Sequence, residues 1–184
     1  MIRIIKKSEL QTSYWAGGTT TELFIYPEFA IYKKMDFDFR ISTATIEIDT
    51  SIFSTLKDVQ RTLMVLDGTL ELTHKDHHTA ILKPFEIDSF GGEWQTTSRG
   101  KAVDFNLMLR DSNLSGRVKA ITIRRKSSNT FDTGKHGIIY FYKGDVAYNN
   151  GTELSVGDTV YFNSDDSVTI LAKSTVKIVF VTIQ

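Results

Sequence analysis

Short stretches in which apolar and polar residues alternate recur along nearly the whole chain. They are rich in Val, Ile, Thr, Phe and Tyr and are divided by Gly, Asn and Asp, a pattern typical of β-strands joined by tight turns. Helical periodicity is nearly absent, so the sequence predicts an all-β protein, either a sandwich or a barrel. Strands are expected at 19–26, 37–48, 61–67, 79–82, 103–109, 137–143, 145–148, 159–162, 168–172 and 176–183.

The composition narrows the classes of partner. Lys and Arg together number 22, as do Asp and Glu, so the formal net charge is zero. A neutral chain does not favour a surface that follows nucleic-acid phosphates, and we expect no nucleic acid partner. Cysteine is absent, which excludes disulfides, thiol nucleophiles and thiolate metal sites.

The location of the protein is also indicated by what the sequence lacks. The first residues are charged and are not followed by the apolar run of a signal peptide. No segment approaches the ~20 apolar residues of a membrane helix. A chain without cysteine fits a reducing compartment. We therefore expect a cytoplasmic protein with no membrane partner.

One rhythm of turns and strands occurs twice in the chain. Residues 65–86 contain a glycine turn, a strand, a short hairpin, a second turn and another strand, and residues 142–160 repeat this order. Such an order is typical of a cupin jelly roll. The polar, aperiodic stretch 124–130 is expected to be a linker or a long surface loop between two β units. We expect a first barrel at 1–118 and a second, smaller barrel at 119–184, sharing strands so that they form one compact unit.

Five motifs in the first part of the chain occur in order and at compatible distances. They are Trp15-Ala-Gly-Gly-Thr-Thr-Thr-Glu22-Leu, Phe39-Arg40-Ile-Ser42-Thr-Ala44, Phe53-Ser54, Arg61-Thr62-Leu63 and Asp104-Phe105-Asn106-Leu107-Met108. Together they resemble the HutD/Ves family. The resemblance implies an RmlC-like cupin jelly roll, in the form of a bicupin with two closely packed β-barrels. It also implies a link to histidine utilisation for some members and to stress response for others.

Cupins that carry a metal place three histidines and a glutamate around one ion, and this chain lacks that set. When the cupin motifs are aligned on Gly68 and Pro84, the glutamate position falls on Arg61 and one histidine position on Ser89. A fixed guanidinium would repel a divalent cation and attract an anion. In the second half the ligand positions fall on Gly137 and Val160. We expect no cupin metal centre and no cofactor in either barrel.

Three of the four histidines lie close together, at His74, His77 and His78, between two expected strands. Lys75 and Asp76 lie beside them. We interpret this cluster as an exposed hairpin tip rather than as a metal clip.

The strand expected at 103–109 carries polar residues on one face. Asp104 and Asn106 share that face, and the other face is apolar. Because the apolar face belongs in a core, the polar face must meet either water or a polar pocket. Arg61 begins an apolar strand, and a buried arginine requires a carboxylate partner. Asp104, Glu22 and Glu93 are the candidates for that partner.

By resemblance, the polar residues that the family shares fall here on Trp15, Thr20, Glu22, Arg40, Arg61, Asp104 and Asn106. Our hypothesis is that some of them line the mouth of the first barrel. There Arg61 would hold the carboxylate of a small organic acid through two parallel hydrogen bonds, and Trp15 would form an apolar wall. In the alternative interpretation, Arg61 and Asp104 are an internal ion pair that fixes the strand register. Both interpretations stay open.

Three functions are compatible with this sequence. The first is a metal-independent protein that binds a small carboxylate ligand and acts as a sensor or regulator in amino-acid catabolism or stress response. The second is a metal-free cupin enzyme, an isomerase, lyase or hydrolase, with Asp104 or Glu22 as general base. The third is an interaction protein that forms a homodimer through the apolar strands at 138–142 and 176–183. A serine nucleophile is not expected, because no G-x-S-x-G elbow occurs.

Overall fold

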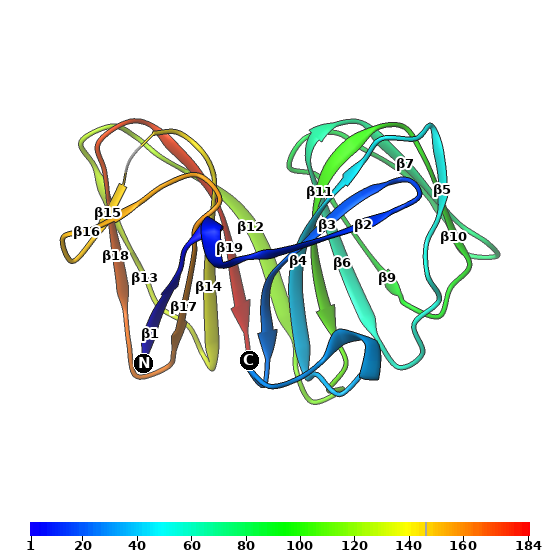
Figure 1. Cartoon of the computed structure of the whole chain (residues 1–184), viewed down its shortest axis with the longest axis horizontal. Helices are drawn as coiled ribbons and strands as arrows, with labels where there is room; N and C mark the ends of the chain where they lie inside the picture. Colours follow the sequence, from blue (N-terminus) through cyan, green and yellow to red (C-terminus); the bar gives the residue numbers. More distant parts are fainter. Residues whose placement is uncertain (146) are drawn as a thin grey trace. The chain divides into compact units, whose positions relative to one another are not determined.

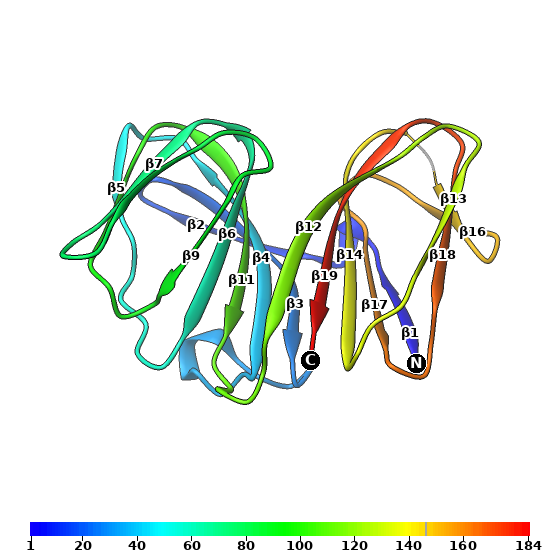
Figure 2. The ribbon, with the colours of Figure 1, turned by 180° about the vertical axis from the view of Figure 1, so that it is seen from behind.

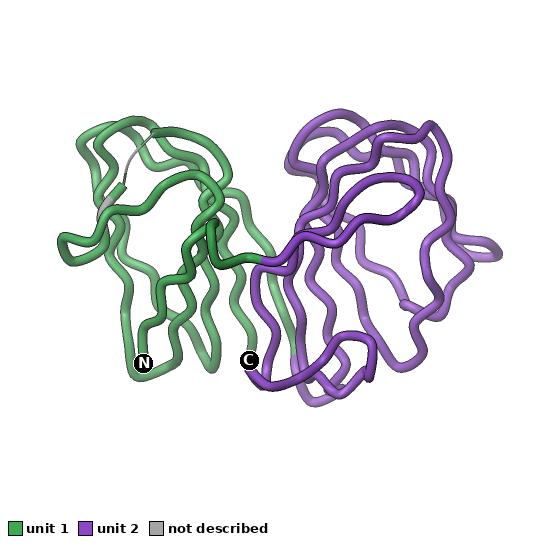
Figure 3. The backbone as a smooth tube through the Cα atoms, viewed as in Figure 1, with its two compact units in different colours: residues 1–10, 115–184 green, residues 11–114 purple. Residues whose placement is uncertain are grey.

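The computed structural model describes residues 1–145 and 147–184. In this part of the chain the regular structure consists of β-strands and two short 3-10 turns, η1 (Lys7–Glu9) and η2 (Tyr32–Lys34) (Figure 1). The all-β prediction is confirmed. None of the described residues forms a helix long and apolar enough to cross a membrane. The chain divides into two compact units: unit 2 is residues 11–114, and unit 1 combines residues 1–10 with residues 115–184 (Figure 3).

Unit 2 is built from two antiparallel sheets. The larger has the order β2 (Gln11–Trp15), β3 (Gly18–Tyr26), β4 (Phe39–Ile46), β11 (Ala102–Leu109), β6 (Gln60–Gly68) and β9 (Ile87–Gly91). The smaller has the order β5 (Thr50–Ile52), β10 (Thr96–Arg99), β7 (Leu70–His74) and β8 (Thr79–Leu82). Both ribbon views show β3, β4, β11 and β6 side by side (Figures 1 and 2).

Apolar side chains from both sheets form a core in unit 2, because residues two apart on a strand point to the same face. Leu63 and Val65 of β6 pack in one cluster with Leu70 and Leu72 of β7. The turn that joins these two strands requires glycine at position 68. Its φ is +81°, and a Cβ atom there would lie 2.4 Å from the carbonyl oxygen of Lys101.

Unit 1 also consists of two antiparallel sheets. The first has the order β1 (Ile2–Ile5), β17 (Thr159–Asn163), β14 (His136–Lys143), β19 (Val176–Ile183) and β12 (Gly116–Ile123). The second has the order β13 (Ser128–Phe131), β18 (Val168–Ala172), β15 (Ala147–Asn149) and β16 (Thr152–Leu154). Of the strand predicted at 145–148, residue 146 lies outside the described residues.

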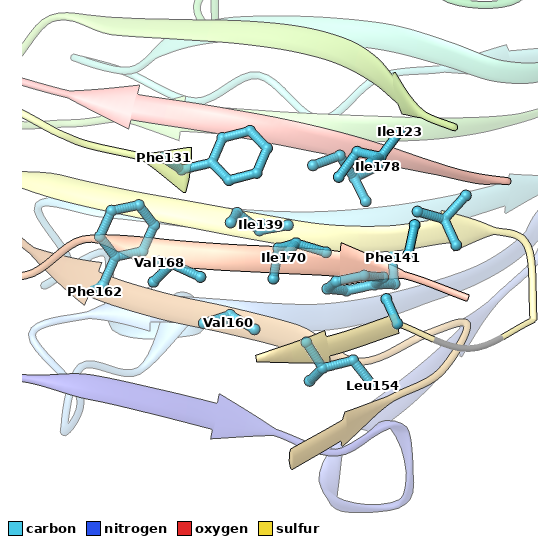
Figure 4. Close-up of a cluster of buried hydrophobic side chains, with 13 residues drawn as sticks. Ile123, Phe131, Ile139, Phe141, Leu154, Val160, Phe162, Val168, Ile170 and Ile178 are labelled. Atoms are coloured by element: carbon cyan, nitrogen blue, oxygen red, sulfur yellow. The ribbon is translucent and has the colours of Figure 1, made fainter. Parts of the chain in front are cut away.

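The interior of unit 1 is apolar (Figure 4). Ile139 and Phe141 of β14 pack in one cluster with Val168 and Ile170 of β18, and all four side chains are buried. Phe162 of β17 is fully buried in the same cluster. The alternation along these strands therefore supplies one continuous hydrophobic core, which is the main favourable contribution to folding.

The boundaries of the two units differ from the ranges 1–118 and 119–184 expected from the sequence. Residues 1–10 belong to unit 1, because β1 pairs with β17 along its whole length. Unit 1 resumes at Ser115, because β12 pairs with β19. The stretch 124–130 was expected to separate two β units, and this prediction is wrong. Its first residues form the connection between β12 and β13, and both strands belong to unit 1.

A buried carboxylate holds the first residues of the chain in unit 1. Asp158 is 3% exposed and accepts hydrogen bonds from Lys6 Nζ at 2.8 Å and from the backbone N–H of Lys7 at 2.9 Å. It also accepts one from the backbone N–H of Ser155 at 3.0 Å. Burial alone would raise the pKa of Asp158, but these hydrogen bonds lower it below the ordinary value.

Replacing Asp158 should therefore destabilise unit 1. We expect Asp158→Ala to lower the free energy of unfolding by about 2–4 kcal/mol at pH 7, because it leaves buried donors without an acceptor. The cost should shrink at acid pH. A carboxyl whose folded pKa is lowered stabilises the fold above its unfolded pKa, and this stabilisation is lost as the pH falls through the folded pKa.

Urea unfolding followed by circular dichroism measures this effect. Asp165→Ala is the matched control, because Asp165 is an exposed carboxylate of the same unit. Tryptophan fluorescence reports unit 2 separately, since both tryptophans, Trp15 and Trp94, lie there. Equal losses in the two variants would contradict the anchoring role of Asp158.

Candidate functional site

A cavity of about 310 Å³ lies within unit 2. Its walls come from β2 to β6 and from β11, with further residues from η2 and from the segment after β5. Six of the seven predicted binding residues line it: Trp15, Thr20, Arg40, Arg61, Asp104 and Asn106. The seventh, Glu22, is bonded to Arg40. The fold thus brings the predicted set together, and the ligand-binding role of its members stays a prediction.

The strand register explains this convergence. On β11, Asp104 lies opposite Ala44 of β4, and Asn106 lies opposite Ser42. One step further, Met108 lies between Arg40 on β4 and Arg61 on β6. Because residues two apart share a face, these rows place the polar side chains on the cavity side of the sheet.

Both faces of β11 are buried. Phe105 and Leu107 on one face are fully buried, and Asp104 and Asn106 on the other are 2% and 5% exposed. Of the two environments that the sequence left open for the polar face, water or a pocket, the structure shows the pocket. The register shifts at a β-bulge between Val103 and Asp104, at the start of the polar pair.

Arg61 is held in the cavity wall by two aromatic rings and one long hydrogen bond. It is 7% exposed, and its guanidinium carbon lies 4.8 Å from the ring centroid of Phe53 and 5.1 Å from that of Phe90. Its Nη2 donates to Asn106 Oδ1 at 3.3 Å. The amide Nδ2 of Asn106 in turn donates to Asp104 Oδ1. Asn106 therefore connects the arginine to the carboxylate.

The carboxylate partner expected for Arg61 is not in direct contact with it. In the described part of the chain, Arg61 forms no ion pair within 4.0 Å, and its buried Nε–H has no acceptor. Of the three candidate partners, Glu22 pairs with Arg40, Glu93 is exposed, and Asp104 acts through Asn106. The alternative of a direct Arg61–Asp104 ion pair is therefore wrong for this structure.

Arg40, by contrast, has a direct counterion. Its Nε donates to Glu22 Oε2 at 2.7 Å, and its Nη1 donates to Ser42 Oγ at 3.3 Å. The guanidinium carbon lies 4.1 Å from the ring centroid of Tyr32, at the distance of a cation–π contact. The positive charge of Arg40 is thus compensated within the protein.

Burial shifts the pKa values of the connected pair in the directions that disfavour charge. Desolvation raises the pKa of Asp104 to about 7, although Arg61 and the hydrogen bond from Asn106 oppose the shift. Desolvation lowers the pKa of Arg61 to about 10, although Asp104 opposes it. At pH 7 the guanidinium is charged and Asp104 is near its titration midpoint. Arg61 therefore carries a charge that is only partly compensated near neutral pH.

Some residues of the cavity wall are not among the seven predicted binding residues. Tyr32 lies in η2 and Phe53 follows β5, and both line the cavity. Ser51 also lines it, with its Oγ 2.7 Å from Ser98 Oγ. These residues belong to irregular or very short segments in which no periodicity marks a face. The Phe53-Ser54 motif was the one signal for this part of the wall.

The positions of the cupin metal motif do not fit a metal. A buried guanidinium occupies the glutamate position at Arg61. At the histidine position, the exposed Ser89 pairs its Oγ with Thr62 Oγ1 at 3.1 Å. Neither position offers an imidazole or a carboxylate, the ligands that a transition metal requires there.

The prediction of an exposed hairpin tip is wrong for His74. His77 and His78 are exposed, but His74 is 2% exposed, because it ends β7 with its side chain on the same face as Leu70 and Leu72. No strand was expected at 70–74, so the face that His74 shares with Leu70 and Leu72 was not recognised.

Solved structures with the same fold cover the whole chain. A conserved protein of unknown function from Pseudomonas aeruginosa PAO1 has a TM-score of 0.82 at 18% identity, with 100% of this chain and 99% of that chain covered. HutD from Pseudomonas fluorescens SBW25 has a TM-score of 0.77 at 20% identity, with 100% of both chains covered. YhhW, a pirin from Escherichia coli, has a TM-score of 0.74 at 14% identity, with 98% and 97% covered. These likenesses confirm the RmlC-like bicupin fold.

The family is shown by a different comparison. Comparison with the curated proteins found no match. The family model described as HutD, however, matches residues 7–180, nearly the full length of the sequence. The resemblance inferred from the five motifs is confirmed, and the chain belongs to the HutD family.

Proposed function

We propose that this protein binds a small organic acid, without a metal, in the cavity of unit 2, and that Arg61 holds the carboxylate of the ligand. The observation that carries the proposal is the buried guanidinium on the cavity wall, which forms no ion pair with the described residues. Membership of the HutD family supports a sensing or regulatory role linked to histidine or amino-acid catabolism, or to stress response.

The chemistry of the cavity favours an anion. A guanidinium removed from water attracts a carboxylate more strongly than an exposed one does, because the local dielectric is low. Asn106 fixes one edge of the guanidinium, so less side-chain entropy is lost on binding. Arg40 already has Glu22 as its counterion, which leaves Arg61 as the anchor. A volume of about 310 Å³ lies at the small end of ligand pockets.

Replacing Arg61 should strongly weaken ligand binding without destabilising the fold. A thermal-shift and calorimetric screen against urocanate, formylglutamate, glutamate and small dicarboxylates should find an acid that stabilises the protein. We expect Arg61→Gln to lower the affinity for that acid by at least about 30-fold, equivalent to about 2 kcal/mol, because a buried charge pair is lost. The variant without ligand should be as stable as the parent or more so, since a partly compensated buried charge is removed.

Arg99→Gln is the matched control for this experiment. Arg99 is an exposed arginine of the same unit, so its replacement removes one positive charge outside the cavity. If the affinity for the acid falls equally in Arg61→Gln and Arg99→Gln, the acid binds only through long-range electrostatic attraction to the positive charges of the protein. That result, or the absence of stabilisation by any acid, would contradict the proposal.

The affinity for the acid should increase as the pH falls. With the pKa of Asp104 at about 7, its carboxylate is ionised at pH 8 and repels the ligand, whereas at pH 6 it is mostly protonated. If the anion binds only the protonated form, affinity falls up to about 10-fold between pH 6 and pH 8. Calorimetry in buffers of different ionisation enthalpy should show proton uptake on binding.

Asp104→Asn should remove this dependence. The amide oxygen of the new side chain can still accept from Asn106, so the connection to Arg61 is retained. We expect the variant to bind the acid at pH 8 as tightly as the parent does at pH 6. If the affinity of Asp104→Asn for the acid still changes with pH, another group titrates, and the role of Asp104 is contradicted.

One observation favours an enzymatic alternative. A carboxyl with a pKa near 7 beside a small-molecule cavity is suited to act as a general base. In that case the stabilising acid should also be converted, and Asp104→Asn should bind it without turnover. Nuclear magnetic resonance of the acid incubated with the protein distinguishes a metal-free isomerase, lyase or hydrolase from a binding protein.

A further inference from the structure

Three side chains with metal-binding atoms converge at another part of the unit 2 barrel. His74 ends β7, His78 lies in the turn before β8, and Asp88 lies on β9. His74 Nε2 is 2.8 Å from Asp88 Oδ2. His78 Nε2 is 3.0 Å and 3.1 Å from the two oxygens of the same carboxylate. We propose that these three residues form a binding site for one divalent transition-metal cation, with zinc as the best-fitting ion.

The turn between β7 and β8 places both imidazoles on the same side. The backbone N–H of His74 donates to the carbonyl of His78 at 2.9 Å, and that of His77 donates to the carbonyl of His74 at 3.0 Å. Asp76 has a φ of +63°, which closes the turn. The ring of His77 stacks on Trp94 with 3.6 Å between centroids, outside the group of three.

The second ring nitrogen of His74, Nδ1, has a hydrogen-bond partner of the kind that orients metal-binding histidines. His74 Nδ1 lies 2.8 Å from Thr96 Oγ1, and Thr96 Oγ1 donates to the carbonyl of Trp94 at 3.3 Å. Without a metal, the contact between Nε2 and Asp88 requires a proton on Nε2, because a carboxylate oxygen only accepts. A bound cation would replace that proton, and Nδ1–H would then donate to Thr96 Oγ1, whose own proton goes to the carbonyl of Trp94. Metal-binding histidines are oriented by such a second hydrogen bond.

The surroundings are suited to a site that a cation can enter. The side chain of His74 is fully buried and packs on Phe90, with 4.4 Å between ring centroids. Asp88 is 12% exposed and His78 is 43% exposed. Two ligands are therefore held by the fold, and the third is reachable from solvent. Three protein ligands leave a fourth position for water, as in open zinc sites.

The donor set selects the class of ion. Two imidazole nitrogens and one carboxylate suit zinc and its neighbours, whereas calcium and magnesium prefer oxygen alone. Ligand atoms at about 2.0–2.1 Å from a tetrahedral zinc lie roughly 3.3 Å apart. The separations between the histidine nitrogens and the Asp88 oxygens, 2.8–3.1 Å, would have to widen by a few tenths of an ångström, and all three ligand atoms lie within 4.8 Å of one another.

The proposed metal site is separate from the anion cavity. None of its three residues lines that cavity. Phe90 lies between the two sets of polar groups, since it contacts both Arg61 and His74. The site also differs from the motif positions at Arg61 and Ser89, so it does not restore the cupin metal centre. Binding of zinc and binding of the acid can therefore be tested independently.

Calorimetry with zinc chloride and the tag-free, chelator-treated full chain tests the proposal. We expect one zinc ion per chain. Affinity should fall about tenfold or more in His78→Ala and in Asp88→Asn, which remove one ligand each. Thr96→Val keeps the shape of the side chain but removes the hydroxyl, and it should lower the affinity for zinc by about 10-fold or more. His77→Ala is the matched control on the same turn and should keep the parent affinity.

A spectroscopic measurement separates the site from loose contact with surface histidines. Cobalt(II) bound in the place of zinc should give visible absorption of a four-coordinate ion, and His78→Ala should lose it while its circular dichroism stays unchanged. No zinc binding by the folded parent at millimolar concentration would overturn the proposal. Equal weakening in His77→Ala and His78→Ala would overturn it as well. Either result would leave Thr96, His74 and Asp88 as a hydrogen-bonded structural chain.

Discussion

The Arg61 guanidinium lies in the barrel wall against the rings of Phe53 and Phe90, and its link to a carboxylate passes through Asn106. Withdrawing a charge from water is costly unless nearby groups compensate it. Here compensation is incomplete, because desolvation also raises the pKa of the Asp104 carboxyl. The proposed preference for an anion and the proposed proton uptake both follow from this one imbalance.

The barrel of unit 2 keeps its polar groups in two places and fills the space between them with apolar side chains. Arg61, Asn106 and Asp104 form the first group, and His74 and Asp88 belong to the second. Phe90 touches both and belongs to the hydrophobic core. Because that core excludes water, each group interacts through its own hydrogen bonds rather than through solvent. One small barrel thus keeps two chemically different groups of polar side chains apart.

Membership of the bicupin fold fixes the arrangement of strands in this chain but not the side chains inside its barrels. At 14–20% identity the full-length solved structures share the arrangement of strands. Strand pairing and alternating burial depend on residue class rather than on identity, so the same backbone accepts different side chains in its interior. When the cupin motifs are aligned on Gly68 and Pro84, an arginine and a serine fall at positions where a metal-binding cupin carries ligands. Function in such a fold must be argued from the individual cavity.

The sequence by itself determined the all-β class, the long central strands and the shared face of Asp104 and Asn106. Their period of two is a local property, and Asp104 and Asn106 share a face whatever surrounds them. It could not show β2, whose residues are all exposed and have no buried face to mark them. Only the tertiary structure assigned residues 1–10 to unit 1, paired Arg40 with Glu22 and buried His74. These outcomes depend on contacts between segments distant in sequence, which periodicity along one strand does not encode.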